Sequence, residues 1–358
     1  MHFRELLKIE SCKKFPNFEL IFRELFDTIS SEKFPKGGEH MSDLGKMKEL
    51  IQEKAELEAR LSLLPYDGSP EIKENSSGKY LYVRKRVGSR LTSTYVDSYS
   101  DDLYQLLLRN AKEGREIKKS IRKLDKELAE IGYVKEKPDA KVILNLDLAR
   151  ANLKTSIYDQ AVLEGVSTTF PQTEDIIENG TVNGMTATDV QKVLNLKHAW
   201  EFILDEDIIS ADSDYYLLCH IAKLVNEGFY SDGGRIRGVP VTIGGCKYTP
   251  PIPIESVVKE CIHDITCSDK TTIDKAIELC LYSMKTQVFP DGNKRASVIF
   301  ANHFLISRGE GLLSVPEKHV SKFKKLLVDY YEGERSDKIR EFLKANCWIR
   351  MQSTSKDR

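Results

Sequence analysis

Apolar residues recur every three or four positions through most of the chain, which is the spacing of helices with one buried face. The first such run covers residues 44–64, and Pro65 follows it. A second run follows the helix-capping sequence Ser100-Asp101-Asp102 and ends at Gly132. Between them, two strand-like runs flank a Gly-Ser turn, as in a β-hairpin. The pattern predicts a helical-hairpin, coiled-coil-like arm that carries a β-hairpin.

Beyond residue 137 the same spacing predicts a helix-rich domain, so the fold class is mainly α. The predicted helices cover residues 149–164, 186–205, 213–226, 253–266, 271–286, 295–307, 320–331 and 337–346. A Pro- and Gly-rich interruption at 232–251 contains a predicted short hairpin at 239–248. We therefore expect an arm over residues 41–137, a helical domain over 138–350 and a disordered tail over 351–358.

Residues 1–40 show no sustained period, and we expect an irregular leader there. The peptide Lys36-Gly37-Gly38-Glu39-His40 before Met41 can be back-translated to a purine-rich ribosome-binding sequence. One interpretation is that translation starts at Met41 rather than Met1. The other is that Gly37-Gly38 is a turn before a helix. Both remain open.

The overall charge and composition give no signal for nucleic acid or membrane. The formal net charge is −1, and 41% of residues are hydrophobic. No apolar run approaches the roughly 20 residues that span a bilayer, and residues 1–5 do not resemble a signal peptide. The seven cysteines include no Cys-x-x-Cys pair, which favours reduced thiols. We therefore expect a cytoplasmic protein.

The predicted β-hairpin combines basic and aromatic residues. They are Lys79, Arg84, Lys85, Arg86 and Arg90, with Tyr80, Tyr82 and Tyr95. Such interleaving can bind a nucleic-acid backbone. It is equally typical of a solvated hairpin with aromatic cross-strand pairs. The nearby residues Asp97, Asp101 and Asp102 favour the second interpretation, because they weaken the positive field.

Candidate chemistry is concentrated in Phe289-Pro290-Asp291-Gly292-Asn293-Lys294-Arg295. Pro290-Asp291-Gly292-Asn293 is a turn sequence, and an apolar helix follows it. A turn that leads into a helix points backbone N–H groups and the positive end of the helix dipole at one place. Lys294 and Arg295 add positive charge, and Asp291 offers an oxygen suited to Mg²⁺. The segment predicts a site for a nucleoside triphosphate with its metal.

This segment resembles the signature loop of the Fic/Doc superfamily, His-x-Phe-x-(Asp/Glu)-Gly-Asn-(Gly/Lys)-Arg, with the Doc-like Lys at position 294. Gly233-Gly234-Arg235-Ile236-Arg237, followed by residues 241–251, resembles the Fic flap. The flap is a hairpin whose edge aligns a target segment by strand addition. The resemblance covers residues 150–350. It implies a Fic-type helical core with a β-hairpin flap, and the use of ATP to transfer AMP, or phosphate in Doc, to a target hydroxyl.

The resemblance also implies roles for individual residues. Asp291 would hold Mg²⁺, and the nucleotide would be bound by Gly292, Asn293, Lys294 and Arg295. The target-binding flap would comprise Ile243, Gly244, Gly245, Cys246, Lys247 and Tyr248. ATP with Mg²⁺ is therefore the expected ligand, and a protein hydroxyl is the expected acceptor.

Two departures from the family pattern change the expected activity. The catalytic His position is Gln287, and an amide cannot act as the general base, a role typically worth about 10²–10⁴-fold in rate. The family's inhibitory helix, (Ser/Thr)-x-x-x-Glu-(Gly/Asn), aligns with residues 167–172, with Ser167 first and Pro171 at the Glu position. The arginine that pairs with this Glu is replaced by Val298. Both ends of the inhibitory ion pair are thus expected to be missing.

The sequence therefore predicts a Fic-family nucleotide-binding protein with reduced or altered transfer activity. One alternative is an active AMP- or phosphotransferase, such as a Doc-like toxin, that uses another base. A second alternative is a non-enzymatic interaction protein that binds a protein partner or a nucleic acid through the arm at residues 41–137.

Overall fold

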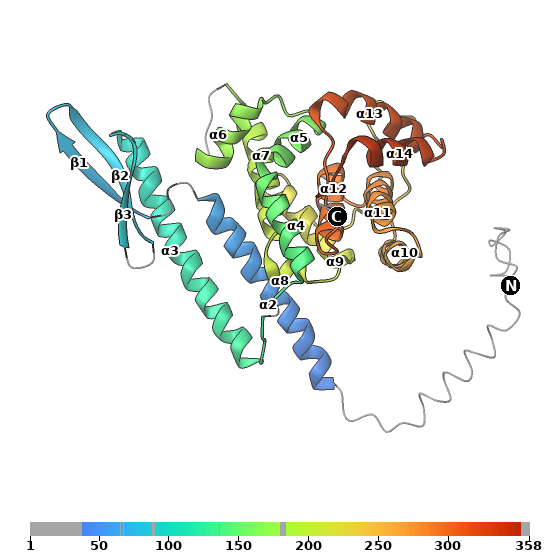
Figure 1. The fold of residues 1–358 in the computed structure, drawn as a ribbon, viewed down its shortest axis with the longest axis horizontal. Helices are drawn as coiled ribbons and strands as arrows, with labels where there is room; N and C mark the ends of the chain where they lie inside the picture. Colours follow the sequence, from blue (N-terminus) through green and yellow to red (C-terminus); the bar gives the residue numbers. More distant parts are fainter. Residues whose placement is uncertain are drawn as a thin grey trace, which may run out of the picture. The chain divides into compact units, whose positions relative to one another are not determined.

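The computed structural model describes residues 38–64, 66, 68–87, 90–135, 137–179 and 184–351 (Figure 1). The chain divides into two compact units, Met1–Lys48 and Glu49–Arg358. The expected leader over residues 1–40 lies outside the described residues, except that helix α2 (Gly38–Leu63) already begins at Gly38. The expected tail lies outside them beyond residue 351. None of the helices in the described ranges is long and apolar enough to cross a membrane.

The arm contains a three-stranded antiparallel sheet between α2 and α3 (Asp101–Glu130). Its strands are β1 (Ser69–Asn75), β2 (Gly78–Val87) and β3 (Arg90–Ser98), with β2 in the centre. Leu81 and Val83 of β2 are buried together with Leu107 of α3, so one face of the sheet packs on this helix (Figure 1). The Ser100 side chain accepts a hydrogen bond from the N–H of Leu103 and caps α3 as predicted.

Strand β1 was not predicted, because the pattern indicated only the two strands of a hairpin. Its sequence, SPEIKEN, has a single large apolar residue, Ile72, and no alternation that would indicate a strand. It forms because its residues find antiparallel partners along β2, from Ser69 opposite Arg84 to Asn75 opposite Gly78. The stabilising interaction is the cross-strand pairing, which this segment's own residues do not encode.

Helix α2 is attached to the C-terminal helices by ion pairs. Arg60 contacts Glu113 of α3 at 3.2 Å and Glu227 at 2.6 Å. His198 Nδ1 lies 3.1 Å from the Glu227 carboxylate. The hydrogen bonds from His198 and Arg60 outweigh burial and lower the pKa of Glu227 to about 2. The arm's first helix therefore docks on the domain instead of standing apart from it.

The remaining described elements are mainly helical, in agreement with the prediction. They are α4 (Ala140–Ala151), α5 (Leu153–Leu163), α6 (Phe170–Asn179), α7 (Ala187–Ile203), α8 (Glu206–Ile209), α9 (Tyr215–Val225), α10 (Glu255–Cys267), α11 (Thr272–Thr286), α12 (Asn293–Ile306), α13 (Glu317–Tyr331) and α14 (Asp337–Asn346), with a two-stranded sheet of β4 (Leu312–Leu313) and β5 (Trp348–Ile349). The helix predicted over residues 149–164 corresponds to α5 and the last three residues of α4, and the rest of α4 was not predicted. Helix α6 was not predicted.

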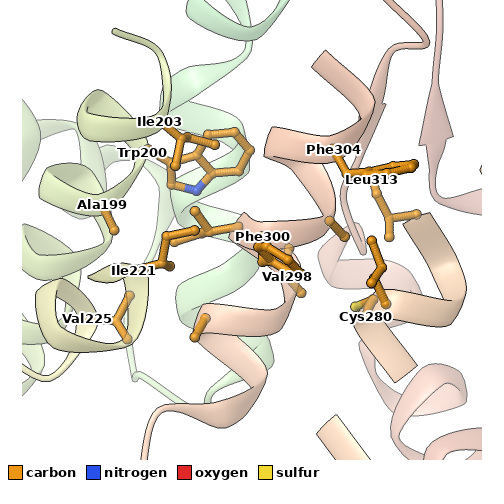
Figure 2. Close-up of a cluster of buried hydrophobic side chains, with 14 of the residues drawn as sticks. Ala199, Trp200, Ile203, Ile221, Val225, Cys280, Val298, Phe300, Phe304 and Leu313 are labelled. Atoms are coloured by element: carbon orange, nitrogen blue, oxygen red, sulfur yellow. The ribbon is translucent and has the colours of Figure 1, made fainter. Parts of the chain in front are cut away.

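Helix α12 lies at the centre of the hydrophobic core (Figure 2). Every residue of α12 except Lys294 is buried. Figure 2 shows Val298 and Phe300 between Ile221 of α9 on one side and Cys280 of α11 on the other. A helix buried on all sides has a fixed position, so the loop that precedes its N-terminus is fixed as well.

The flap segment corrects another prediction, because residues 239–248 contain no strand. Pro240 and the Pro250-Pro251 pair remove ladder donors, and Gly245 turns the chain with φ of 75°. The segment is held instead by contacts with the end of α13. The N–H of Lys247 donates to Glu332 at 2.8 Å, and Tyr248 stacks on Tyr331.

Candidate nucleotide-binding site

The loop between α11 and α12 is braced by one amide side chain. Asn293 Oδ1 accepts from the N–H of Phe289 at 2.9 Å, and its Nδ2 donates to the Phe289 carbonyl at 2.7 Å. Gly292 precedes α12 in the left-handed region, with φ of 72°. The first N–H groups of α12 have no carbonyl partners within the helix and point out of its N-terminus. This arrangement is suited to binding an anion.

Gln287 stands at the end of α11 and is tied into the same loop. Its Nε2 donates to the Met284 carbonyl at 2.6 Å, and its Oε1 accepts from Asn293 Nδ2 at 3.2 Å. Its backbone is left-handed, with φ of 49°. The side chain therefore stabilises the loop, and as an amide it has no basic atom to accept a proton.

Arg295 is almost fully buried, with 2% of its surface exposed. It donates to the Val225 carbonyl at 2.7 Å and pairs with Asp291 at 3.1 Å. Its Nε lies 3.6 Å from Glu164. The guanidinium is thus fixed in place by groups from three segments of the chain. Only one oxygen of Asp291 takes part in this pair.

Glu164, at the end of α5, is a site residue that the sequence reasoning missed. Its carboxylate also lies 3.3 Å from the ammonium of Lys294. An acidic side chain therefore faces the loop from a position other than the one that the sequence assigned. The assigned positions, Ser167 and Pro171, are exposed and do not line the cavity described next. Glu164-Gly165 fits the Glu-(Gly/Asn) part of the pattern, with Gln160 at the Ser/Thr position.

A cavity of about 430 Å³ lies between the loop, the flap and helix α13. This volume is in the range of small-molecule sites. Its lining comprises Glu164, Thr242, Ile243, Gly244, Gln287, Asp291, Gly292, Asn293, Lys294, Lys324, Leu327, Val328 and Tyr331. Among the buried polar atoms of the lining, the Tyr331 hydroxyl makes no hydrogen bond, and Glu164 Oε1 is held by its ion pair with Lys294 alone. A buried hydroxyl without a hydrogen bond is costly, so it indicates a place for a polar ligand.

Asp291 can contribute to a metal site, since its side chain is half exposed at the cavity. The described residues contain no cluster of three or more His, Cys, Asp or Glu that could hold a metal ion. A site with one carboxylate fits Mg²⁺, which is commonly held by one or two carboxylates together with phosphate oxygens and water.

Asn226 is a second residue that the sequence reasoning missed, and it fastens two turns together. Its Nδ2 donates to the carbonyls of Gly233 and Asp291, both at 3.0 Å. A Cβ on Gly233 or Gly292 would lie within 2.6 Å of the Asn226 side chain. These glycines are therefore required by close packing against Asn226.

Arg237 connects the flap to the loop. The buried guanidinium donates to the carbonyls of Gln287 at 2.5 Å, Val239 at 2.7 Å and Pro251 at 2.6 Å. Of the predicted flap residues, Ile243 and Gly244 line the cavity. Gly245 lies at the turn, and Cys246, Lys247 and Tyr248 attach the segment to the core. The structure thus brings only the first part of the flap to the loop.

His303 is buried and does not line the cavity. Its Nε2–H donates to the Ile208 carbonyl at 2.9 Å, and its Nδ1 accepts from the Ser213 hydroxyl at 2.8 Å. Burial lowers the pKa of His303 to about 4. The imidazole is a neutral core group.

Two segments of the chain match models of known protein families, and one of them contains this loop. Residues 212–305 match the model of the Fic/DOC family, and residues 45–105 match a domain of unknown function, DUF6788. The first match covers both the loop and the flap segment. It confirms the resemblance to the Fic/DOC family for this part of the chain. A search of curated proteins gives no match.

Solved structures with similarity to the chain are Fic proteins at low identity. Fic-1 (residues 134–508) from C. elegans has a TM-score of 0.46 and 18% identity, over 68% of this chain and 74% of that one. A Fic domain containing signalling protein from Bacteroides thetaiotaomicron has a TM-score of 0.45 and 14% identity, over 58% and 85%. A Fic family protein from Desulfovibrio desulfuricans has a TM-score of 0.42 and 15% identity, over 60% and 77%.

Proposed function

We propose that the chain is a Fic-type nucleotide-binding protein that holds ATP with Mg²⁺ in the cavity at the N-terminus of α12. The observation that carries this proposal is the convergence of a helix N-terminus, Lys294 and the buried Tyr331 hydroxyl, which makes no hydrogen bond, on one cavity. A triphosphate is the ligand class that such a positive, hydrogen-bond-donating site favours. The free oxygen of Asp291 would bind the metal together with the phosphates.

The same site supports reduced or altered transfer of AMP rather than ordinary transfer. Gln287 occupies the position of the family's base, and its amide is already engaged with Met284 and Asn293. The carboxylates that line the cavity, Glu164 and Asp291, are both ion-paired. Removing a proton from an attacking hydroxyl would require one of them to leave its pair.

Calorimetric titration of the purified chain with ATP, with and without Mg²⁺, tests nucleotide binding. We expect saturable, Mg²⁺-dependent binding that is weakened by Lys294→Met and unchanged by Lys318→Met, an exposed lysine on α13. Each charge-assisted contact to phosphate contributes about 1.5–3 kcal/mol, so Lys294→Met should weaken binding roughly tenfold or more. Absence of binding at millimolar ATP would overturn the proposal.

An active transferase with another base is the second candidate. Host lysate incubated with the chain and ATP labelled at the α- or γ-phosphate separates the possibilities. Transfer of the α label at an ordinary enzymatic rate would establish AMP transfer, and transfer of the γ label would establish phosphotransfer. The reduced-activity proposal predicts neither. A protein partner on the arm stays a prediction, and α2 offers it a limited surface because Glu56 and Arg60 already bind the domain.

A further inference from the structure

The three-stranded sheet of the arm has an exposed face that the nucleotide site does not use. Along β2, the buried residues Leu81 and Val83 alternate with Tyr80, Tyr82, Arg84 and Arg86. Successive side chains of a strand point to opposite faces, so these four residues project away from α3. We call the face they share the outer face. The register extends it to the cross-strand partners of these residues on β1 and β3.

Three tyrosines form a continuous aromatic surface on the outer face. Tyr95 of β3 stands opposite Tyr82, with ring centroids 5.5 Å apart, and lies 6.3 Å from Tyr80. Half of the Tyr95 surface is exposed. Aromatic pairs on sheets are ordinary stabilising contacts. Tyr80 and Tyr82 are partly buried and support Tyr95 by tilted and edge-on contacts, so the exposed ring of Tyr95 is the centre of an aromatic platform on which a planar base can stack.

Positive charge surrounds this platform. Arg84 and Arg86 are exposed and follow the tyrosines along β2, about 7 Å apart. Lys73 of β1 covers the Tyr82 ring at 4.1 Å and pairs with Glu71 at 3.8 Å. Among the residues that the register assigns to the outer face, Glu71 is the one acidic side chain, so Arg84 and Arg86 remain as its excess of positive charge. The outer face is therefore basic although the whole chain is nearly neutral.

The sequence favoured a plain solvated hairpin because Asp97, Asp101 and Asp102 lie nearby in the chain. In the structure these residues lie away from the outer face. Asp97 pairs across the strands with the buried Leu81, and the register shifts between this pair and the Tyr82–Tyr95 pair, so Asp97 is not a cross-strand partner of any residue of the outer face. Asp101 and Asp102 lie in the first turn of α3, and Asp101 accepts a hydrogen bond from the Tyr99 hydroxyl. The acidic residues that are close in sequence do not share the outer face.

We propose that the outer face of this sheet binds single-stranded nucleic acid, with a base stacked on Tyr95, which Tyr80 and Tyr82 support, and phosphates bound by Arg84 and Arg86. Single strands fit because their bases are accessible for stacking, whereas the bases of a duplex are already stacked on one another. A protein partner would also use tyrosine and arginine, but an arginine pair set beyond an aromatic platform matches the alternation of base and phosphate. The proposal is independent of nucleotide binding in the domain.

Fluorescence anisotropy with labelled oligouridylate, oligothymidylate and a duplex, each of about 20 units to exceed one site, tests the aromatic part. We expect the intact chain to bind one or both single strands more tightly than the duplex. Comparison of oligouridylate with oligothymidylate then identifies RNA or DNA as the ligand. Tyr95→Ala should weaken binding roughly 5- to 150-fold, because one stacked base contributes about 1–3 kcal/mol. Tyr95→Phe should bind like the wild type, because it retains the ring. Tyr230→Ala, at a similarly exposed tyrosine outside the arm, should have no effect.

The salt dependence tests the phosphate contacts separately from stacking. Arg84→Gln combined with Arg86→Gln should reduce the slope of log affinity against log salt by about 1.4, since each phosphate contact with a single strand contributes about 0.7. Lys123→Gln combined with Lys126→Gln removes the same charge from the exposed side of α3 and should leave the slope unchanged. Circular dichroism verifies that the variants remain folded.

Four results would overturn the proposal. The first three are absence of single-strand binding at low salt, tighter binding of the duplex, and equal effects of the outer-face variants and their matched controls. The fourth is binding of a protein from the same cells to this face that single-stranded nucleic acid does not displace, because it would assign the surface to a protein partner.

Discussion

The carboxylate of Glu164 lies 3.6 Å from the Nε of Arg295, at the end of the cavity where α12 begins. The same carboxylate lies 3.3 Å from Lys294. An anion of the protein therefore already neutralises part of the positive charge that a triphosphate would use. A bound phosphate must displace Glu164 from these cations or accept a like charge close by. Either alternative lowers the affinity for ATP.

Replacing this carboxylate should strengthen nucleotide binding. In Glu164→Gln the side chain keeps its size and loses its charge, so Lys294 becomes available to phosphate. We expect calorimetry to show ATP affinity increased roughly 5- to 30-fold, equivalent to about 1–2 kcal/mol for one screened charge interaction. Glu178→Gln, an exposed surface position paired with Lys154, is the matched control and should leave the affinity unchanged. Weaker binding in Glu164→Gln would mean that Glu164 assists the ligand, for example through the metal.

Restoring a base at position 287 should restore transfer if the rest of the site is competent. Gln287→His places an imidazole where the amide now stands, and His tolerates the left-handed backbone of this residue better than most side chains. We expect transfer of α-labelled phosphate from ATP to increase by about 10²–10⁴-fold. The control is Gln287→Asn, which keeps an amide and should gain nothing. A folded, ATP-binding Gln287→His variant without transfer would show that the site lacks more than the base.

The loop itself could be predicted because its determinants are local. A turn sequence, a glycine with positive φ and an apolar helix are adjacent in the chain. Gly292 and Asn293 could therefore be identified as site residues from the sequence. Glu164 and Asn226 could not be found this way. Each approaches the loop only through the packing of α5 and α9 around α12, and no spacing in the sequence records that proximity. The Glu164-Gly165 pair was the one available signal.

The prediction for the flap was wrong, and strand β1 was missed, for a related reason. A strand forms only where it has a partner strand, and alternation of apolar residues in one segment does not guarantee a partner. Residues 239–248 alternate yet contain no strand, because Pro240 and the contacts with α13 determine their path. Residues of β1 do not alternate, yet they pair with β2. Most of the helices were predictable, since their hydrogen bonds are internal to each segment, and α6 is an exception.

Gly292 should not tolerate a side chain. Its φ is 72°, and a Cβ would lie 2.6 Å from Asn226 Oδ1, so Gly292→Ala must strain the backbone and displace a fully buried amide. We expect urea unfolding to show a loss of about 2–4 kcal/mol, together with loss of ATP binding. Gly238→Ala, where a Cβ would meet nothing within 4 Å, should change the free energy of unfolding by less than about 1 kcal/mol. Equal stability of the two variants would contradict the proposed role of Asn226 as a brace.

The buried imidazole of His303 should make stability fall in mild acid. Burial lowers the pKa of His303 from 6.5 to about 4 in the folded chain, whereas the unfolded chain has the ordinary value. Between these two pH values the unfolded chain binds a proton that the folded chain does not, so protonation favours unfolding. The contribution of His303 to stability is fully present above about pH 6.5 and is lost as the pH falls towards 4.

Urea unfolding of the wild type and His303→Gln at two pH values isolates this contribution. The glutamine can still donate to the Ile208 carbonyl and accept from Ser213, but it does not titrate. Between about pH 7 and pH 5 the wild type should lose about 2 kcal/mol more than the variant, which is the free energy of excluding one proton over that interval. Parallel losses in the two proteins would mean that His303 is protonated in the folded chain, and that Ser213 then accepts its second N–H.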